Sequence, residues 1–331
     1  MKRPEQTGSV GVVIAAYRAA DTIGAAVASA LAEPEVGQVV VVDDASGDDT
    51  PAAALAADDG SGRLTVLRQA VNQGPACARN RALAVLTTPW VCVLDSDDYF
   101  LPGRTARLLA LTEGQDLVAD ALIKVTSGAA PPALSTTTQA EQINLEAFVR
   151  GNVSRQGRDR QELGFIKPLM RMAFLRRHAL TYDDSLRLGE DYAFYAAALA
   201  HGAQLLLTGP QGYVAVTRPD SLSGRHSEED LRRLRDCDRD IAAVRPLSRA
   251  ESAALDAHAV SVDQRLQWRL LINAVKARDP AAMAATVTSW PVARFLAARL
   301  IEQLWLRTLG RVKRAPEPAA LPLRPEPKAR S

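Results

Sequence analysis

The sequence predicts an α/β fold with a doubly wound, mostly parallel sheet. Over the first hundred residues, apolar runs typical of strands alternate with segments typical of helices, and the runs contain few polar breaks. Strands that are covered by helices on both faces have this composition, and regular alternation with helices is typical of parallel sheets.

Each element of this first part follows from its own signals. Apolar runs predict strands at residues 9–16, 38–46, 63–69 and 89–95. Helices are predicted between them at residues 20–34, 47–58 and 74–86. Asp21 or Thr22 can cap the first helix and Pro34 follows it, while Pro51 and Pro75 stand near the first turns of the other two, where proline is tolerated.

After Pro102 the alternation is weaker. Helices are predicted at residues 103–114 and 143–152, within residues 164–180 after Pro168, and at residues 189–202. Strands are predicted at 114–127, 204–209 and 212–218, and a small-residue loop at 127–142. Residues 227–310 have a helical pattern, and the residues after them are rich in proline and charge, which is typical of disorder. We therefore expect a main α/β domain over residues 1–226, a helical extension over residues 227–310 and a disordered tail over residues 311–331.

Composition excludes several classes of protein. The 331 residues are 47% hydrophobic and 24% charged, which favours a sizeable core, and the net charge of +2 is too small to indicate a nucleic-acid partner. Three cysteines without a C-x-x-C pattern predict neither a disulfide framework nor a zinc site, so a cytoplasmic location is expected. We find no signal peptide and no apolar run long enough to span a bilayer.

Carboxylates collect where ligands of such sheets bind, after the carboxyl ends of the strands. Asp43 and Asp44 end the second predicted strand, and Asp95 and Asp97 follow the fourth. Residues two apart in an extended segment point the same way, so Asp95 and Asp97 can face one ligand. Facing carboxylates repel unless a cation lies between them, and oxygen ligands suit Mg²⁺ or Mn²⁺, which usually share their coordination with phosphates. The pattern indicates a metal that carries a diphosphate; a solvated turn with a helix cap is the alternative.

Other phosphate-binding patterns can be tested directly. The sequence has no G-x-G-x-x-G after its first strand and no G-x-x-x-x-G-K-[ST], so it lacks the dinucleotide fingerprint and the P-loop. Phosphatases of the haloacid dehalogenase type also carry D-x-D after a strand, but normally after the first strand. Here the D-x-D follows the fourth.

Five motifs occur in order between about residues 9 and 225: VVIAAYRAADTIGAAVASAL, VVVVDDASGDDT, NQGPACARNRAL, VLDSDD and GEDYAFYAAAL. Together they resemble a family 2 glycosyltransferase with the GT-A fold, of the non-processive type found in bacterial polysaccharide biosynthesis. The processive members carry Q-x-x-R-W, whereas this chain has QRLQW, with Gln267 in the arginine position. The resemblance implies a nucleotide-sugar donor, usually a UDP-sugar, a divalent metal ion and inversion of the anomeric centre.

The resemblance also implies roles for residues that bind the nucleotide. Tyr17, together with Ala15, matches the stretch that packs on uracil. Asp44, with Asp43 beside it, matches the carboxylate that accepts the uracil N–H, and Arg79 matches a basic residue near the diphosphate. The residues alone leave other interpretations open: a core aromatic for Tyr17, helix caps for the two aspartates and a solvated helix residue for Arg79.

At the reacting centre the resemblance implies metal and base roles. Asp97 matches the direct metal ligand, and Asp95 matches the ligand of the ribose or of a metal-bound water, with Ser96 between them. Asp191 matches the general base, with Glu190 beside it. Both of these carboxylates can instead be helix N-terminal residues, which are favourable there anyway.

The expected function is that of a metal-dependent, inverting glycosyltransferase of the hexosyltransferase type. The resemblance favours a polyprenyl-diphosphate-linked oligosaccharide of a surface or exopolysaccharide pathway as the acceptor. Two alternatives stay open: a non-catalytic nucleotide-sugar-binding component of an assembly complex, and a GT-A-like nucleotidyltransferase. The intact D-x-D and the Glu190–Asp191 pair argue against the first, and the missing glycine-rich loop argues against the second.

The last predicted helix suggests a membrane surface as a further partner. An apolar face recurs at helical spacing along residues 291–310, and Arg311, Lys313 and Arg314 follow it. An apolar stripe with a tryptophan and a basic end suits a helix that lies on an anionic bilayer, here the inner face of the cell membrane. Packing of this helix on the protein is the alternative. The apolar face consists of Ala293, Ala297, Leu300, Ile301, Leu304 and Trp305.

Overall fold

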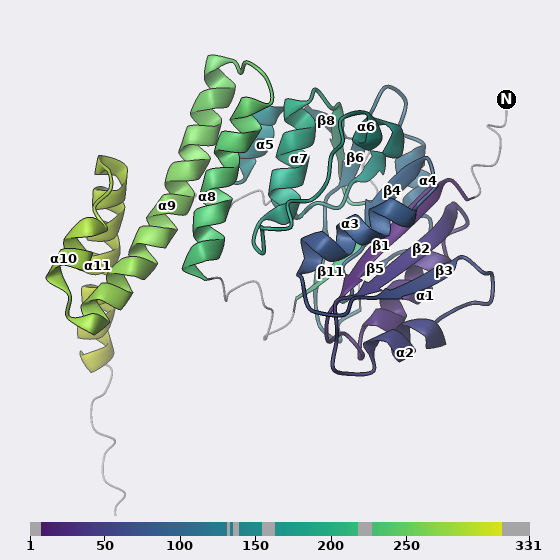
Figure 1. Cartoon of the computed structure of the whole chain (residues 1–331), viewed down its shortest axis with the longest axis horizontal. Coiled ribbons are helices and arrows are strands. Elements are labelled where there is room, and N and C mark those ends of the chain that lie inside the picture. The colour runs from purple at the N-terminus through teal and green to yellow at the C-terminus, as the bar shows by residue number, and fades with distance from the viewer. Residues whose placement is uncertain (1–7, 131–132, 135–138, 154–162, 218–226, 313–331) are drawn as a thin grey trace, which may run out of the picture. The chain divides into compact units, whose positions relative to one another are not determined.

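The computed structural model describes residues 8–130, 133–134, 139–153, 163–217 and 227–312, with side chains described as far as Leu306. The chain divides into two compact units, Met1–Leu266 and Gln267–Ser331. The first unit contains the sheets and most of the helices, and the second is helical (Figure 1).

The first unit is built on an eight-stranded sheet in the order β3-β2-β1-β4-β9-β6-β10-β8. Only β8 and β9 run antiparallel to their neighbours, so the predicted mostly parallel sheet is confirmed. The strands are β1 (Val10–Ala16), β2 (Val36–Asp43), β3 (Leu64–Arg68), β4 (Trp90–Val93), β6 (Leu117–Asp120), β8 (Ala140–Ile143), β9 (Leu169–Arg171) and β10 (Leu205–Thr208).

Helices cover both faces of this sheet. On one face, α1 (Ile23–Leu31), α2 (Thr50–Ala56) and α4 (Arg104–Leu109) share a core with Val12 and Ile14 of β1. Val13 points to the opposite face, where α3 (Pro75–Val85) packs (Figure 1). Burial of both faces explains why these strands have almost continuous apolar sequences.

A second, three-stranded sheet has the order β5-β11-β7, with β5 (Tyr99–Phe100), β11 (Tyr213–Thr217) and β7 (Ile123–Thr126). The single strand predicted over residues 114–127 is therefore wrong, because the chain forms β6 in the large sheet and β7 in the small one. The change of pattern marks the break: every residue of β6 is buried, whereas β7 alternates between buried and exposed residues.

The helix predicted after Pro168 is also wrong at its start. Leu169 and Met170 form β9, which inserts between β4 and β6, and α6 (Met172–Arg177) begins only afterwards. Proline is tolerated just before or at a helix start, so Pro168 does not by itself prevent a helix there. The edges of β4 and β6 give Leu169 and Met170 backbone partners, and this pairing decides their conformation. Pairing between segments so far apart in the chain leaves no local pattern in the sequence.

Helices α5 (Leu145–Gly151), α7 (Glu190–Ala200) and α8 (Glu228–Ala243) complete the first unit, together with the 3₁₀ turn η1 (Leu163–Phe165) and the first part of α9 (Arg249–Ala277). The Tyr192 hydroxyl donates to Asp238 Oδ1 at 2.7 Å, and His258 Nδ1 lies 2.7 Å from Asp238 Oδ2. These buried contacts tie α7, α8 and α9 together. The first unit thus extends to Leu266, and the expected boundary at residues 226/227 differs from this division.

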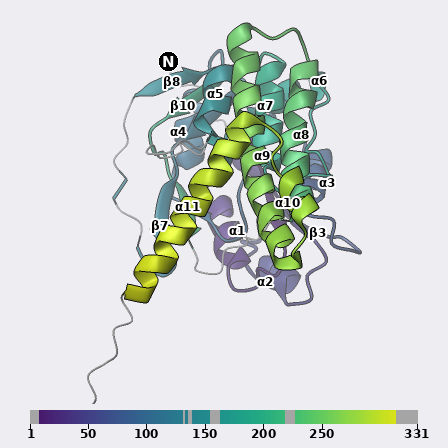
Figure 2. The ribbon, with the colours of Figure 1, turned by 90° about the vertical axis from the view of Figure 1, so that its left-hand side faces the viewer.

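The second unit contains the end of α9, α10 (Pro280–Ala285) and α11 (Trp290–Val312), the long yellow helix in Figure 2. Its small core is formed by Leu271, Val292 and Leu296, with Trp268, Met283 and Phe295 packed against them. Among the described residues, no helix is long and apolar enough to cross a membrane. The expected tail lies outside the described residues from residue 313 onward.

Candidate active site

Three carboxylates and two cations meet beyond the carboxyl end of β4, and we call this group the charge cluster. Arg79 of α3 contacts Asp95 Oδ1 through Nη2 at 3.0 Å, and through Nη1 it contacts Glu190 Oε1 at 2.7 Å and Asp191 Oδ1 at 3.3 Å. Lys167 Nζ lies 3.0 Å from Asp95 Oδ2 and 2.5 Å from Asp191 Oδ2. The sequence predictions for Arg79, Asp95, Glu190 and Asp191 therefore converge on one place in the structure.

Local structure explains the position of the two carboxylates of α7. Glu190 and Asp191 are its first residues, where the helix dipole favours negative charge. Gly189, just before them, has a φ of +74°, and a Cβ there would lie 2.6 Å from Leu234 Cδ1 of α8. Glycine is favoured at this position, because any other residue would adopt a strained left-handed backbone and would have to displace the Leu234 side chain.

The buried charges of the cluster balance one another. Burial alone would raise the pKa of Asp95, but Lys167 and Arg79 outweigh it and hold that pKa below its usual value. Burial would likewise lower the pKa of Lys167, whereas Asp191 and Asp95 raise it above its usual value. Asp95 is therefore ionised and Lys167 protonated at neutral pH. Arg79 is buried, so the solvated-helix interpretation of this residue is wrong.

Two buried atoms of the charge cluster have no hydrogen bond among the described residues, Arg79 Nε and Asp191 Oδ1, and only the second is an acceptor. Asp191 is 7% exposed, and its Oδ2 accepts from Lys167. Its Oδ1 has no hydrogen-bond donor in the described part of the chain, although Arg79 lies near it. Leaving a buried acceptor unsatisfied is costly, and such atoms often mark functional sites. An oxygen in this state can accept the proton of a bound hydroxyl group.

Two residues of the site were not found by sequence reasoning. Lys167 stands alone in the apolar stretch GFIKPLM, and a buried lone lysine would have been the only signal. Tyr213 of β11 donates its hydroxyl to Asp98 Oδ2 at 2.8 Å and accepts from the Asp95 amide at 3.1 Å. The Val216 amide also donates to Asp98, and burial and then Asp95 raise the pKa of Asp98 to about 7.

The donor set fits a hard divalent cation that shares its coordination with a ligand. Asp97 is half-buried and follows Asp95 of the charge cluster by two residues. Burial first, and then the negative charges of Asp95 and Asp97, raise the pKa of the neighbouring Asp98. Both oxygens of Asp95 are already in ion pairs, which favours a contact through water. The described residues contain no group of three or more metal-ligating side chains, and Mg²⁺ usually needs only one or two carboxylates beside phosphate and water.

The aspartates after β2 hold the neighbouring loops. Asp44 accepts from Gln69 Nε2 at 2.7 Å and from the amides of Gln73 and Gly74, both at 2.8 Å. Asp43 accepts from the Ser46 amide. Neither residue caps α2, whose N-cap position is Asp49, so the helix-cap interpretation is wrong.

The ends of β1 and β2 lie side by side, because Ala16 pairs with Asp43. Ala15 is half-buried in β1, and Tyr17 follows the strand with 40% of its surface exposed, so the core-aromatic interpretation is wrong. The Arg18 guanidinium lies over the Tyr17 ring at 5.3 Å. Ser96, between the two aspartates of the D-x-D, is half-buried.

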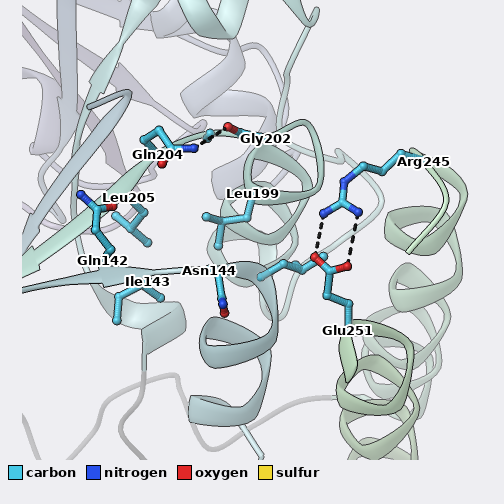
Figure 3. A pocket seen from close by; sticks show the side chains of 11 residues that line it. Gln142, Ile143, Asn144, Leu199, Gly202, Gln204, Leu205, Arg245 and Glu251 are labelled. Atoms are coloured by element: carbon cyan, nitrogen blue, oxygen red, sulfur yellow. Dashed lines mark hydrogen bonds and ion pairs between the residues drawn. The ribbon is translucent and has the colours of Figure 1, made fainter. Parts of the chain in front are cut away.

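A separate pocket of about 290 Å³ lies at the opposite edge of the sheet. It is lined by Leu205, the first residue of β10. Because β10 runs in the same direction as β1 and β4, the pocket lies at the amino ends of these strands, whereas the charge cluster lies beyond the carboxyl end of β4. Figure 3 shows Arg245 and Glu251 facing each other across one side of it, with Arg245 Nη2 2.7 Å from Glu251 Oε1. No residue of the charge cluster lines this pocket.

The chain is similar to several known proteins. A family model described as glycosyl transferase family 2 matches residues 11–177. The succinoglycan biosynthesis protein ExoU of Rhizobium meliloti (strain 1021) is 48% identical over 268 residues, which cover 80% of the chain and 78% of ExoU. Escherichia coli WfaP, named UDP-Glc:alpha-D-GlcNAc-diphosphoundecaprenol beta-1,3-glucosyltransferase, is 33% identical over 105 residues, which cover 31% of the chain and 41% of WfaP.

Similarity extends to solved structures. Residues 1–349 of S. aureus TarS in complex with UDP-GlcNAc match with a TM-score of 0.61 and 18% identity, over 84% of the chain and 90% of that structure. At this identity the match supports the fold. The range of the family model contains Arg79, Asp95 and Lys167 but ends before α7, which provides the two carboxylates of the GED motif.

Proposed function

The chain belongs to glycosyl transferase family 2, and on that premise we propose that it inverts the anomeric centre while moving one sugar from a UDP-sugar to a hydroxyl group of a lipid-linked oligosaccharide. Membership of the family makes the chain a glycosyltransferase. The donor, the metal ion, the acceptor and the stereochemistry are the proposed parts, and each has its own support.

The observation that carries the proposal is the state of Asp191. This carboxylate is buried, opens α7 and has one oxygen without a hydrogen bond, within a cluster that also contains Asp95 of the D-x-D. An acceptor hydroxyl bound against Oδ1 would lose its proton to Asp191 as its oxygen attacks the sugar carbon. Attack from the side opposite the leaving diphosphate inverts that carbon.

The leaving diphosphate gains negative charge, and the site supplies positive charge near it. Arg79 is held beside Asp95 and is fixed by three carboxylates, so it needs no reorganisation during the reaction. A divalent cation, when bound by Asp97 and through water by Asp95, would offset the same charge. Glu190 fixes Arg79 from the helix side.

The nucleotide fits the ends of β1 and β2. Tyr17 has an exposed ring that can pack on uracil, and Ala15 is half-buried two residues earlier in β1. A carboxylate has about four acceptor sites, and Asp44 uses three of them on the described residues. The remaining one can accept the uracil N–H, while Asp43 keeps the loop in place. We assign Ser96, which is half-buried between Asp95 and Asp97, to the donor side as well.

The relatives support the acceptor class. The name of WfaP states a UDP-glucose donor and an acceptor GlcNAc-diphosphoundecaprenol, and that of ExoU states succinoglycan biosynthesis. We infer that this chain likewise extends a polyprenyl-diphosphate-linked oligosaccharide in exopolysaccharide synthesis.

The test measures UDP released from a panel of UDP-sugars with Mn²⁺ or Mg²⁺. We expect slow release with the correct donor, and none in excess EDTA. Asp97→Ala should abolish release and weaken metal-dependent UDP binding while the protein stays folded. The matched control is Asp256→Ala, at an exposed position of α9, which should leave release unchanged. Full activity of the Asp97 variant, or full activity in EDTA, would contradict the metal role.

The second unit suggests how the enzyme reaches a lipid-linked acceptor. In α11, Val292 and Leu296 face the core of the second unit, whereas Ile301, Leu304 and Trp305 are 67%, 63% and 61% exposed. This exposed stripe includes Leu300 and continues the face predicted from the sequence. The chain then carries Arg307, Arg311, Lys313 and Arg314 with no acidic residue among them. We propose that α11 binds the anionic inner face of the membrane peripherally.

Sedimentation with liposomes tests this second proposal on the full chain. The chain should bind vesicles that contain anionic lipid, and salt should weaken the binding. The double variant Ile301→Gln/Trp305→Gln leaves the core of the second unit intact and should lose binding. Leu55→Gln, at an exposed position of α2, is the matched control. Vesicle binding that survives the double variant, or a loss of self-association instead of a loss of vesicle binding, would contradict the proposal.

A further inference from the structure

Lys167 is held in place from both ends. Its carbonyl accepts from Arg104 Nη2 at 2.7 Å, and Arg104 is itself locked in a fully buried ion pair with Asp120. At the other end, Nζ reaches Asp95 and Asp191, and the whole residue is 4% exposed. A lysine so fixed cannot change its contacts without disturbing the sheet around it.

The two cations of the charge cluster are not equivalent toward Asp191. Arg79 lies 2.7 Å from Glu190 but 3.3 Å from Asp191, so its closer partner is Glu190. Lys167 lies 2.5 Å from Asp191 and donates to its Oδ2. The rotation of the Asp191 carboxylate is therefore determined mainly by Lys167, and that contact leaves Oδ1 as the oxygen without a hydrogen bond.

We propose that Lys167 is a positioning residue that fixes Asp191 with Oδ1 toward the acceptor and ties it to Asp95 on the donor side. The inference rests on the proposed role of Asp191 as the base. Lys167 touches neither sugar in this scheme. Its ammonium orients the base, and its contact with Asp95 keeps the base and the D-x-D in one fixed geometry.

A purely structural ion pair would behave differently from a positioning residue. If Lys167 only stabilised the fold, its replacement would lower Tm while the folded enzyme kept its kcat. A positioning role instead lowers kcat with little change in donor KM, because the misplaced group acts on the chemical step. The effect must also pass through Asp191, so it should disappear when Asp191 can no longer act as a base.

The experiment is a double-mutant cycle. Lys167→Met, which removes the charge and retains an unbranched stem, should lower kcat by about 10²-fold with donor KM changed less than about threefold. In an Asp191→Asn background the same change should have almost no further effect on kcat. Lys276→Met, at an exposed position of α9, is the control and should be neutral. Lys167→Arg keeps the buried charge and should recover about a tenth or more of wild-type kcat.

The outcomes separate the two proposals. If Asp191→Asn leaves turnover intact, the proposed base is wrong. If Asp191→Asn lowers turnover but the Lys167 change multiplies the loss, Lys167 does not act through Asp191 and the inference is overturned. Should Lys167→Met not fold, Lys167→Arg serves in the same cycle: its smaller loss of kcat must likewise vanish in the Asp191→Asn background, and a loss that persists there overturns the inference.

Discussion

Two buried groups of opposite charges lie in the same unit, and they differ in how their carboxylates are satisfied. Each has a guanidinium nitrogen without a hydrogen bond among the described residues, Arg104 Nη1 in one and Arg79 Nε in the other. In the Arg104–Asp120 pair both side chains are fully buried, and both oxygens of Asp120 accept hydrogen bonds, Oδ1 from Arg104 and Oδ2 from the Gln211 and Tyr213 amides. In the charge cluster, Asp191 is also buried and paired, yet its Oδ1 accepts none. Buried charge therefore does not by itself indicate a site here. The oxygen without a donor does.

The largest expected effect lies in the structural pair. Asp120→Ala leaves Arg104 buried without its partner, and breaking a buried pair in this way costs about 3–5 kcal/mol. Unfolding by urea should show this loss of stability, while the fraction that stays folded keeps the kcat of the wild type. A large loss of kcat in a stable Asp120→Ala protein would contradict the assignment of Arg104 and Asp120 as a purely structural pair.

At the charge cluster we expect a smaller effect, and it should change kcat instead of the free energy of unfolding. Asp191→Asn keeps the shape but removes the base, so kcat should fall by about 10²-fold or more, with donor affinity nearly unchanged. Equilibrium binding of UDP and single-turnover kinetics measure the two quantities separately. If donor affinity collapsed as well, Asp191 would be a donor ligand. If stability fell as far as in Asp120→Ala, Asp191 would be a structural residue.

Asp98 shares features with both groups, because its oxygens are satisfied as in Asp120 and it lies next to the charge cluster. Its replacement should have the smallest effect on stability of the three changes. Both of its oxygens accept hydrogen bonds, but burial and the nearby Asp95 raise its pKa to about 7. Because this pKa is higher in the folded state than in the unfolded state, the folded state binds the extra proton, and stability should fall as pH rises from about 5 to about 7. The loss is at most about 2 kcal/mol across that window.

Asp98→Asn should remove this slope, since a neutral amide can replace the protonated carboxyl. Thermal melts in EDTA between pH 5 and 7.5 measure this slope. The Tm of the wild type should fall as pH rises, and the Tm of the variant should change less. Parallel curves for the two proteins would mean that Asp98 does not titrate in this range.

The sequence predicted the large sheet well because its strands have local signals. Long apolar runs bounded by proline and aspartate gave β1 to β4, and the rule about strand ends placed Asp95 correctly. It did not predict β8 or β9, because these short strands gain their conformation only from distant partners; β8 (Ala140–Ile143) lies where a loop and a helix start were predicted. Lys167 was missed for the same reason: its role depends on β9 bringing residue 167 beside Asp95.

Strand β9 also has a consequence for how the protein is made. A nascent chain that ends before residue 169 can form only β3-β2-β1-β4, and the edge of β4, which is entirely apolar, then has no partner. Open apolar edges promote aggregation, and pairing across long stretches of chain is slow. In the finished protein Arg171 covers Trp90, with its guanidinium 4.5 Å from the ring. The same short strand covers this edge and brings Lys167 beside Asp95. Synthesis must therefore pass residue 171 before the edge of β4 is covered, and residue 191 before the charge cluster is complete.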